Sequence, residues 1–388
     1  MASIAGGQYT FFAAGTAVNV VATSDGMNLP PPIHGDFNLE LITGPGDPPG
    51  MPYGYQGVAL ESADGRTLDL LRGDYGVRIT DGGPHTIIAG TGNDSIQGGA
   101  GPDRIFGGSG HDVILGGSGP DVIYAGTGRD TITAGSGPTT IYGGHSDPRG
   151  FDWFGGRGDG DLRGVDKFGG RGDGDPRSFD QFEDHGHAGD LISGGNGPDV
   201  IYGGDGNDTI QGGTGPDTIY AGSGRDLITG GNGPDLIYGG SGKDTIQGGT
   251  GPDTIYAGSG RDQITGGSGP DTIYGGSGRD LITGGTGNDL IIGGSGHETI
   301  DGGAGNNTIQ VGTATTLIQD SGVTGHDTVV GFDVAHGDRI GFEGENNASI
   351  DKVVATANVH SGNTTISLPD GSTMTLVGIS HIDHTFFH

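Results

Sequence analysis

The chain has 388 residues, of which 91 are glycine, 30% are hydrophobic and 6% are aromatic, and its formal net charge at pH 7 is −31. This composition excludes one large globular core, and it would leave an ordinary chain disordered unless cations neutralised its carboxylates. Nucleic acid is an unfavourable partner for so acidic a chain, no apolar run is long enough to span a membrane, and the lack of cysteine excludes disulfides and thiolate sites.

Residues 1–80 are predicted to form a β-rich N-terminal cap or assembly region. Strand-like stretches at 9–22 and 66–80 flank a segment rich in proline and glycine. The N-terminus lacks the basic residues that open a Sec-type signal peptide, so no such signal is expected.

Residues 81–146 and 189–318 repeat the nine-residue unit G-G-x-G-x-D-x-I-x. Isoleucine recurs every nine residues from Ile87 to Ile141 and again from Ile192 to Ile318. The x-I-x part predicts a three-residue strand with one side chain inward and two outward, and the glycine-rich part predicts a turn. Two units make a flattened coil, so stacked coils are expected to form two parallel sheets around a narrow isoleucine core.

A second period of 18 residues distinguishes the two edges and the two faces of each coil. Alternate units carry proline before the aspartate and an aromatic residue after the isoleucine. The aromatic column consists of Phe106, Tyr124, Tyr142, Tyr202, Tyr220, Tyr238, Tyr256 and Tyr274. The other units place Asn93, His111, Arg129, Asn207, Arg225, Lys243, Arg261 and Arg279 before the aspartate. The column stabilises neighbouring coils by stacking, or it docks on another copy or on a polysaccharide. Ice binding by the opposite Thr/Gln face is a more remote reading, because threonine is not regular there.

Residues 147–188 interrupt the repeat with three copies of a 14-residue unit. Removing them joins 143–146 to 189–193 and restores a nonapeptide at the junction. One continuous roll with an insert at a turn is therefore predicted. The insert is rich in large apolar residues such as Trp153 and Phe154, so we expect it to bind a partner or to mediate self-assembly.

Residues 319–388 are expected to form a C-terminal β cap. Before them the repeat degenerates, because Glu298 and Asn307 occupy the aspartate position. Strand-like alternation around turn residues follows from about residue 326 onward.

The aspartates are the candidate metal ligands. Same-edge turns lie 18 residues apart, so their carboxylates would repel one another across one strand spacing unless a cation lay between them. Calcium takes six to eight oxygen ligands from carboxylates and carbonyls, and a glycine-rich turn exposes its carbonyls. The simpler reading, that these residues only favour Asx turns, does not account for their strict register. The predicted ligands are Asp94, Asp103, Asp112, Asp121, Asp130, Asp190, Asp199, Asp208, Asp217, Asp226, Asp235, Asp244, Asp253, Asp262, Asp271, Asp280 and Asp289. Departures at Thr139, Glu298 and Asn307 weaken the case for calcium at those turns.

With the insert removed, residues 86 to about 310 resemble the calcium-binding β-roll of RTX (repeats-in-toxin) proteins, matching the G-G-x-G-x-D-x-U-x motif almost unit by unit. The resemblance implies an all-β, right-handed parallel β-roll solenoid with many Ca²⁺ ions between successive same-edge turns. It also implies a Gram-negative bacterial protein that a type I secretion system exports unfolded, and that folds with calcium outside the cell or at its surface. The tail 379–388 would then carry an uncleaved export signal.

No enzymatic constellation accompanies the repeats, so the chain is not expected to be an enzyme. The sequence HETID at 297–301 lacks the second histidine of a zinc protease motif, and there is no G-x-S-x-G elbow. His185 and His187 could ligate a metal but read more simply as solvated loop residues. The three RGD triplets are weak signals in a chain so rich in glycine and aspartate.

The first functional prediction is a secreted, calcium-binding structural protein that folds on Ca²⁺ and self-assembles into a surface layer, filament or matrix. The alternative is a carbohydrate-binding or export module that accompanies an extracellular polysaccharide-active enzyme. The expected partners are therefore Ca²⁺, further copies of the chain and, in the alternative, a polysaccharide.

Overall fold

The computed structural model describes residues 82–90, 92–144, 189–322 and 325–388, together with the backbones of strands β1 to β6. The insert at 147–188, His185, His187 and the three RGD triplets lie outside the described residues. The chain divides into two compact units, Met1–Gly206 and Asn207–His388.

The first unit consists of short strands. The first two form a sheet of their own, and from the fourth strand onward the strands alternate between two further sheets. Before the repeats the strands are β1 (Gln8–Ala13), β2 (Thr16–Val21), β3 (Asn38–Ile42), β4 (Gly57–Glu61), β5 (Thr67–Asp69) and β6 (Gly76–Ile79). The repeats form β7 (Thr86–Ile88), β8 (Ser95–Gln97), β9 (Arg104–Gly110), β10 (Val113–Gly117), β11 (Val122–Gly128), β12 (Thr131–Gly135), β13 (Thr140–Tyr142), β14 (Leu191–Asn196) and β15 (Val200–Asp205).

Strand pairing in the first unit is antiparallel only at its N-terminal end, between β1 and β2 and between β3 and β4. From there on it is parallel. Even-numbered strands pair in the order β4, β6, β8, β10, β12 and β14, and odd-numbered strands pair from β5 to β15. Each coil therefore contributes one strand to each sheet, as the period of 18 predicts.

The register continues across the insert. Strand β12 pairs with β14 so that Ile132 lies opposite Ile192, and β13 pairs with β15 so that Ile141 lies opposite Ile201. The hydrogen bonds across this junction join residues 60 positions apart, whereas they join residues 18 apart elsewhere in the roll. The difference is the length of the insert, so the predicted register at the junction is confirmed. The domain boundaries themselves stay a prediction.

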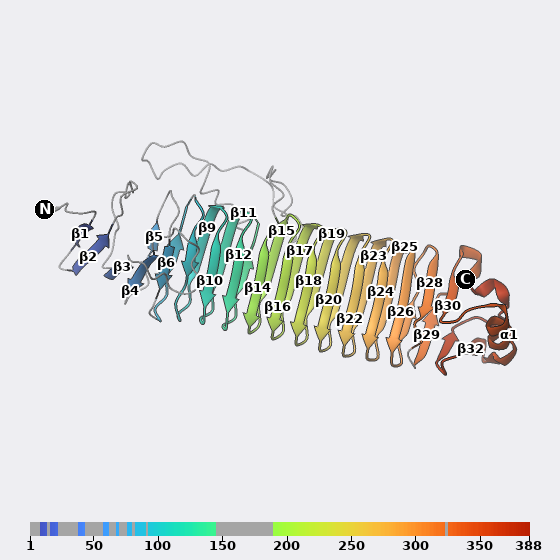
Figure 1. Cartoon of the computed structure of the whole chain (residues 1–388). Coiled ribbons are helices and arrows are strands. Elements are labelled where there is room, and N and C mark those ends of the chain that lie inside the picture. The colour runs from blue at the N-terminus through green and yellow to red at the C-terminus, as the bar shows by residue number, and fades with distance from the viewer. Residues whose placement is uncertain are drawn as a thin grey trace. The chain divides into compact units, whose positions relative to one another are not determined.

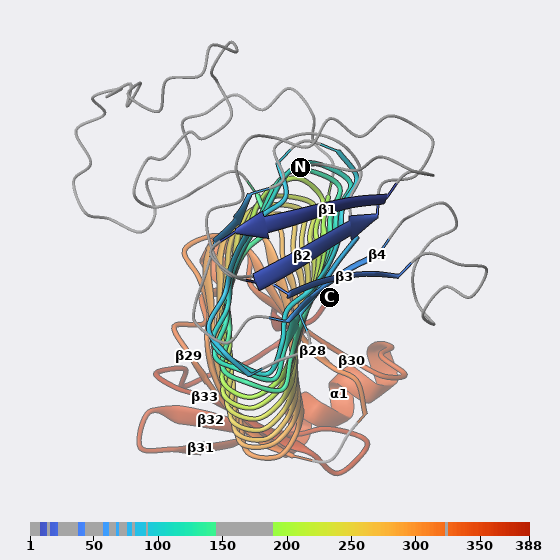
Figure 2. The same ribbon diagram turned by 90° about the vertical axis from the view of Figure 1, so that its left-hand side faces the viewer.

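The second unit has the same arrangement of alternating parallel strands. They are β16 (Thr209–Thr214), β17 (Thr218–Gly224), β18 (Leu227–Asn232), β19 (Leu236–Gly242), β20 (Thr245–Thr250), β21 (Thr254–Gly260), β22 (Gln263–Ser268), β23 (Thr272–Gly278), β24 (Leu281–Thr286), β25 (Leu290–Gly296), β26 (Glu298–Ala304), β27 (Thr308–Gln310) and β28 (Thr316–Asp320). Figure 1 shows these strands side by side, and Figure 2 shows each coil as a flattened oval. The protein is thus an all-β parallel solenoid through its repeats.

The core is a double column of inward isoleucines, each at most 1% exposed between Ile87 and Ile318. Most of the strands are longer than the three residues predicted, so the expected length was wrong for them, whereas β7, β8, β13 and β27 have three residues. The glycine-rich segment begins in extended conformation, so its first residue also faces inward, and Ala125 and Ala221 are fully buried there. Alanine at the first glycine position is thus a core residue rather than a defect.

The second glycine of each turn is required by conformation and by contact. Gly240 has a φ of 102°, and a Cβ atom there would overlap the carbonyl oxygen of Gly222 in the preceding coil. Only glycine combines that backbone conformation with so close an approach of two chains. The stacking distance of the coils therefore depends on this column of glycines.

The aromatic residues stack face to face along the odd-numbered sheet. In the first unit the ring centroids of Tyr124 and Tyr142 lie 4.8 Å apart with planes 3° apart. In the second unit Tyr238 lies 4.8 Å from Tyr220 and 4.9 Å from Tyr256. Stacking between coils is therefore observed, while docking of this face on another molecule stays a prediction.

The parallel pairing extends beyond residue 318 into the C-terminal segment. This segment contains β29 (His326–Val330), the 3₁₀ turn η1 (Val334–His336), β30 (Arg339–Phe342), α1 (Asn347–Thr356), β31 (Asn358–His360), β32 (Asn363–Ser367), β33 (Thr373–Leu376) and η2 (His384–Phe386). Strand β29 pairs with β27, and β30 pairs with β28. Strands β31 and β32, with β33, then form an antiparallel edge.

Helix α1 was not predicted, and it lies within the segment 319–388 that was expected to form a β cap. Asn346 caps the helix by accepting hydrogen bonds from the N–H groups of Ala348 and Ser349, and the Ser349 hydroxyl accepts from the Asn346 N–H. Ile350 and Val353 are the buried residues of the helix. This capping box begins a helix between the two stretches in which alternation predicted strands.

Candidate metal centre

Most turns of the roll bury one acidic residue. All the predicted ligands are at most 5% exposed, although carboxylates are rarely buried unless they are paired or bind a metal. One carboxylate oxygen links neighbouring coils: the Asp235 N–H donates to Asp253 Oδ1 over 2.9 Å, and the Asp244 N–H donates to Asp262 Oδ1 over 2.9 Å. These links explain how the carboxylates are held in line.

The links form one ladder on each edge. The Pro-edge ladder lies in turns that lead from an even-numbered to an odd-numbered strand, and the Arg-edge ladder lies in the others. In the first unit the Pro-edge ladder contains Asp103, Asp121, Thr139 and Asp199, and the Arg-edge ladder contains Asp94, Asp112, Asp130 and Asp190. In the second unit they contain Asp217, Asp235, Asp253, Asp271 and Asp289, and Asp208, Asp226, Asp244, Asp262 and Asp280, respectively.

The second carboxylate oxygen, Oδ2, is where a cation would bind. In many turns this atom is buried and makes no hydrogen bond within the described part of the chain. These residues are Asp121, Asp130, Asp226, Asp235, Asp244, Asp253, Asp262, Asp271, Asp280 and Asp289. A buried carboxylate oxygen without a donor is costly, and a bound cation would offset that cost.

The space beside Oδ2 is small and lined with oxygen atoms. A Cβ atom built on Gly230 would lie 2.5 Å from Asp235 Oδ2 and 2.5 Å from the carbonyl oxygen of Gly248. Gly266 has the same relation to Asp271 Oδ2 and to the carbonyl oxygen of Gly284. A glycine at this position therefore leaves room where carboxylate and carbonyl oxygens converge, which suits a hard cation such as Ca²⁺.

Burial raises the pKa of the ladder carboxyls. The pKa of Asp235 and Asp253 rises to about 6 and that of Asp271 to about 7, because burial disfavours the charged form and the preceding ladder carboxylate repels it. The hydrogen bond from the preceding N–H opposes this rise without cancelling it. A cation between the coils would favour the ionised carboxylates and lower these pKa values.

Two acidic residues that sequence analysis missed extend the ladders. The Asn307 N–H donates to Asp327 Oδ1 over 3.1 Å, and the Thr316 N–H donates to Asp338 Oδ1 over 2.8 Å. Burial raises the pKa of Asp327 to about 6. The sequences GHDTV at 325–329 and GDRI at 337–340 carried the signal, but insertions lengthen their spacing to 20 and 22 residues.

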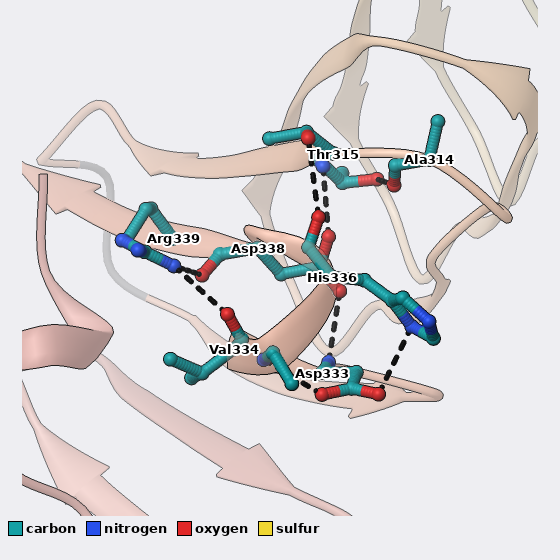
Figure 3. Close-up of polar contacts among 9 residues, drawn as sticks. Ala314, Thr315, Asp333, Val334, His336, Asp338 and Arg339 are labelled. Carbon is teal, nitrogen blue, oxygen red and sulfur yellow. Dashed lines mark hydrogen bonds and ion pairs between the residues drawn. The ribbon is translucent and has the colours of Figure 1, made fainter.

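Two acidic residues near the C-terminal end of the Arg-edge ladder differ in what they leave for a metal. Figure 3 shows Asp338, whose Oδ2 accepts a hydrogen bond from the Asp333 N–H over 2.8 Å, so both of its oxygens are used. Glu298 is 2% exposed, its Oε2 accepts from the Thr316 hydroxyl, and its Oε1 has no partner in the described residues. Burial raises the pKa of Glu298 to about 7.

Two further positions hold a ladder place without an aspartate. The His85 N–H donates to Asp103 Oδ1 over 2.9 Å, and the Thr139 N–H donates to Asp199 Oδ1 over 2.7 Å. The Thr139 hydroxyl donates to the Gly137 carbonyl. Each residue therefore keeps the link from its own N–H to the next aspartate, and neither supplies a carboxylate.

Carboxylates alone do not complete a metal site. Among the described residues, no group of three or more histidine, cysteine, aspartate or glutamate side chains could hold a metal ion. An ion in a ladder would therefore meet at most two carboxylates and would take its other ligands from glycine carbonyls or water. Calcium accepts such mixed oxygen ligands readily, whereas Mg²⁺ demands a near-ideal octahedron.

The comparisons with known proteins agree with this chemistry. The sequence profile of the RTX calcium-binding nonapeptide repeat matches residues 82–114, 106–141, 124–147, 188–219, 202–237, 238–273 and 274–309. The chain belongs to the proteins built on RTX calcium-binding nonapeptide repeats. Such repeats are typical of secreted proteins, and no enzyme family is matched.

Two solved structures show a more distant likeness. One is a hyperactive, Ca²⁺-dependent, β-helical antifreeze protein from an Antarctic bacterium, with 17% identity, a TM-score of 0.27, and coverage of 71% of this chain and 82% of that chain. The other is the extracellular lipase LipA from Serratia marcescens, with 19% identity, a TM-score of 0.18, and coverage of 53% and 40%, respectively. TM-scores this low support no conclusion about the present chain. The comparison with curated proteins gave no match.

Membrane insertion through a helix has no support in the described residues. None of their helices is long and apolar enough to cross a bilayer.

Proposed function

We propose that the protein is a secreted structural protein that folds when Ca²⁺ enters the two ladders and then assembles with further copies of itself. The predicted aspartates are its ligands, together with carbonyl oxygens of the glycine-rich turns. The observation that carries this proposal is the row of buried Oδ2 atoms without hydrogen-bond donors, from Asp226 to Asp289 in the second unit.

Calcium binding would supply stabilising free energy that so narrow an apolar core does not provide. The isoleucine column is only two side chains wide, and it must hold together a chain with a net charge of −31. Metal binding that occurs only in the folded state adds its free energy to folding. The metal-free roll is therefore expected to be largely unfolded and the calcium-loaded roll to be stable.

A calcium titration of the full chain tests this part of the proposal. Circular dichroism and intrinsic tyrosine fluorescence should report a cooperative gain of β structure with Ca²⁺ and little change with equimolar Mg²⁺. An unchanged β spectrum after complete removal of calcium would refute calcium-dependent folding.

We expect export and assembly to depend on calcium as well, because both depend on whether the chain is folded. A chain that stays unfolded at low cytoplasmic calcium can leave the cell through a type I secretion channel and fold outside, where calcium is abundant. Support comes from the repeats, which are typical of secreted proteins. Negative-stain microscopy and light scattering of the purified protein should show particles or fibres with Ca²⁺ and none without it. A monodisperse calcium-loaded monomer would count against self-assembly while leaving calcium-dependent folding intact.

A further inference from the structure

The cationic residues of the second unit's repeats occupy one column on the Arg edge. Arg225, Lys243, Arg261 and Arg279 include every lysine and arginine between residues 207 and 338. They stand at equivalent positions of successive turns, between β17 and β18, β19 and β20, β21 and β22, and β23 and β24. His297 occupies the same position in the next turn. We call these five residues the basic column.

The turn does not need a cation at this position. Where asparagine stands there, its side chain supports the next coil: Asn207 Oδ1 accepts from the Arg225 N–H over 2.8 Å. The N–H groups of Lys243 and Arg261 instead donate to carbonyl oxygens of Gly224 and Gly242, both over 3.3 Å. The cationic side chains replace a residue that stabilises the turn and add no hydrogen bond of their own to it.

The basic column is exposed and unpaired. All five side chains are exposed, and no ion pair joins the four lysine and arginine residues to any carboxylate in the described chain. The column repeats at one strand spacing, about 4.8 Å, so adjacent cations repel each other. The neighbouring aspartates cannot relieve this repulsion, because they are buried at 1% to 2% exposure.

We propose that the basic column binds a linear anionic polysaccharide, whose acidic groups follow the column from coil to coil. A chain of uronic acid or similarly charged sugar rings carries about one anionic group per ring, so its charges repeat on the scale of a strand spacing. The contacts are exposed ion pairs, each weak alone, whose sum over consecutive coils gives useful affinity.

The observations favour this partner over nucleic acid. Double-stranded DNA carries one charge per about 1.7 Å of axis, so a single column spaced at about 4.8 Å leaves most phosphates unpaired beside an acidic protein. Proteins that bind single strands usually offer aromatic faces to the bases. Here Tyr238 and Tyr256 are stacked on each other at 4.9 Å, which covers those faces.

The test uses the calcium-loaded full chain and two cellulose derivatives with the same backbone. Carboxymethyl cellulose is the anionic probe and hydroxyethyl cellulose the neutral one, with single-stranded DNA as a third ligand. Binding is measured by biolayer interferometry at several salt concentrations. Binding to carboxymethyl cellulose, and not to hydroxyethyl cellulose, is expected. Equal binding to both polysaccharides, or tighter binding to the DNA, overturns the proposal.

Matched variants connect binding to the column. Replacing Lys243 with glutamine should weaken binding roughly threefold, the ordinary effect of one exposed ion pair. Lys352→Gln removes the same charge from the exposed side of α1 and should leave affinity unchanged. The combined Arg225→Gln, Lys243→Gln, Arg261→Gln and Arg279→Gln variant should bind at least roughly tenfold more weakly and lower the salt slope by about 3.

The folding of each variant is checked by its calcium midpoint in circular dichroism. If the fourfold variant does not fold, the comparison of Lys243→Gln with Lys352→Gln still decides the question. Equal affinities for these two variants overturn the proposal. This outcome is independent of self-assembly, which the light-scattering experiment measures separately.

Discussion

Most ladder aspartates have two oxygens with different roles. Oδ1 accepts the N–H of the preceding ladder residue and holds neighbouring coils in register, whereas Oδ2 faces the oxygen-lined space between coils. Asn307 shows that the roles can be separated, because its amide oxygen accepts the Asp289 N–H over 2.9 Å without any charge. A substitution can therefore remove the metal ligand and keep the backbone link.

The paired substitutions Asp253→Asn and Asp253→Ala should separate these two roles. Asparagine removes the charged ligand, so it should raise the calcium midpoint several-fold. It keeps an acceptor for the Asp235 N–H, so stability at saturating calcium should fall no further. Alanine also leaves that N–H unsatisfied and should cost a further ~1–3 kcal/mol of stability. Calcium titrations followed by circular dichroism, with urea unfolding at saturating calcium, measure both effects.

Pro252→Ala is the control for this pair, because it changes the neighbouring residue without touching a carboxylate. It should shift the calcium midpoint little. If it shifts the midpoint as much as Asp253→Asn does, Asp253 is not a calcium ligand.

The ladder carboxyls also predict how the metal-free chain responds to pH. Their folded pKa values, about 6 for Asp244 and about 7 for Asp226, lie above the ordinary value of 3.8. The folded state therefore binds more protons than the unfolded state, and stability is greatest at low pH and is lost as the pH rises through 6 to 7. Lowering the pH of calcium-free protein from 8 to 5 should increase its β structure.

The same titration in calcium should run in the opposite direction. Protons compete with Ca²⁺ for the carboxylates, so the calcium midpoint should rise as the pH falls below about 6 to 7. Circular dichroism at fixed pH values measures both trends. A calcium-free spectrum that does not change between pH 8 and pH 5 would contradict the raised pKa values.

The ligand residues that could be predicted from the sequence are those that recur at a strict period. Asp94 to Asp289 could be identified because each lies two positions before an inward isoleucine. Asp327 and Asp338 keep the local motif but lose the spacing, so only the folded pairing of β27 with β29 and of β28 with β30 places them in line.

At the scale of the strand, ring stacking between neighbouring strands of the odd-numbered sheet adds to the stability of the roll. Tyr256 lies between two partners, with ring centroids 4.9 Å from Tyr238 and 4.5 Å from Tyr274. An aromatic pair contributes about 0.5–1.5 kcal/mol beyond the area that it buries. The column therefore reinforces the roll on one sheet only.

Tyr256→Ala should lower the stability of the calcium-loaded protein by ~2–3 kcal/mol, because both ring contacts are lost. Tyr256→Phe keeps the stacked ring and should be nearly neutral. Urea unfolding at saturating calcium compares the two. Equal losses would show that the phenolic hydroxyl, rather than ring stacking, stabilises the column.

Periodicity predicted which elements form better than where they end. The alternation of sheets and the inward isoleucines follow directly from periods of nine and 18, because each coil repeats the same contacts. Strand ends depend on how far the glycines stay extended, and glycine has no preference that would show in the sequence. Helix α1 depends on the local capping box at Asn346 and Ser349, which a search for alternation overlooks.

At the scale of the whole chain, the insert at 147–188 can be tested as a separable part. Its removal should leave folding intact, because Ile132 already lies opposite Ile192 in the uninterrupted register. We expect the shortened protein to bind calcium and fold but to lose assembly. Circular dichroism measures the first property, and light scattering with negative-stain microscopy measures the second. Normal assembly after deletion would show that the insert is not the interface.

Because its coils stack in register, the second unit can change its length in steps of whole coils. Residues 207–242 and 243–278 are nearly identical, and each comprises two coils whose isoleucines, tyrosines and glycines lie over their own kind in the next coil. Unequal recombination between the two blocks would add or remove about 9.6 Å of stacked sheet, two strand spacings, without creating a new junction. The reach of the roll, its calcium capacity and the length of its basic column would then change together, in whole steps, while every local contact stayed the same.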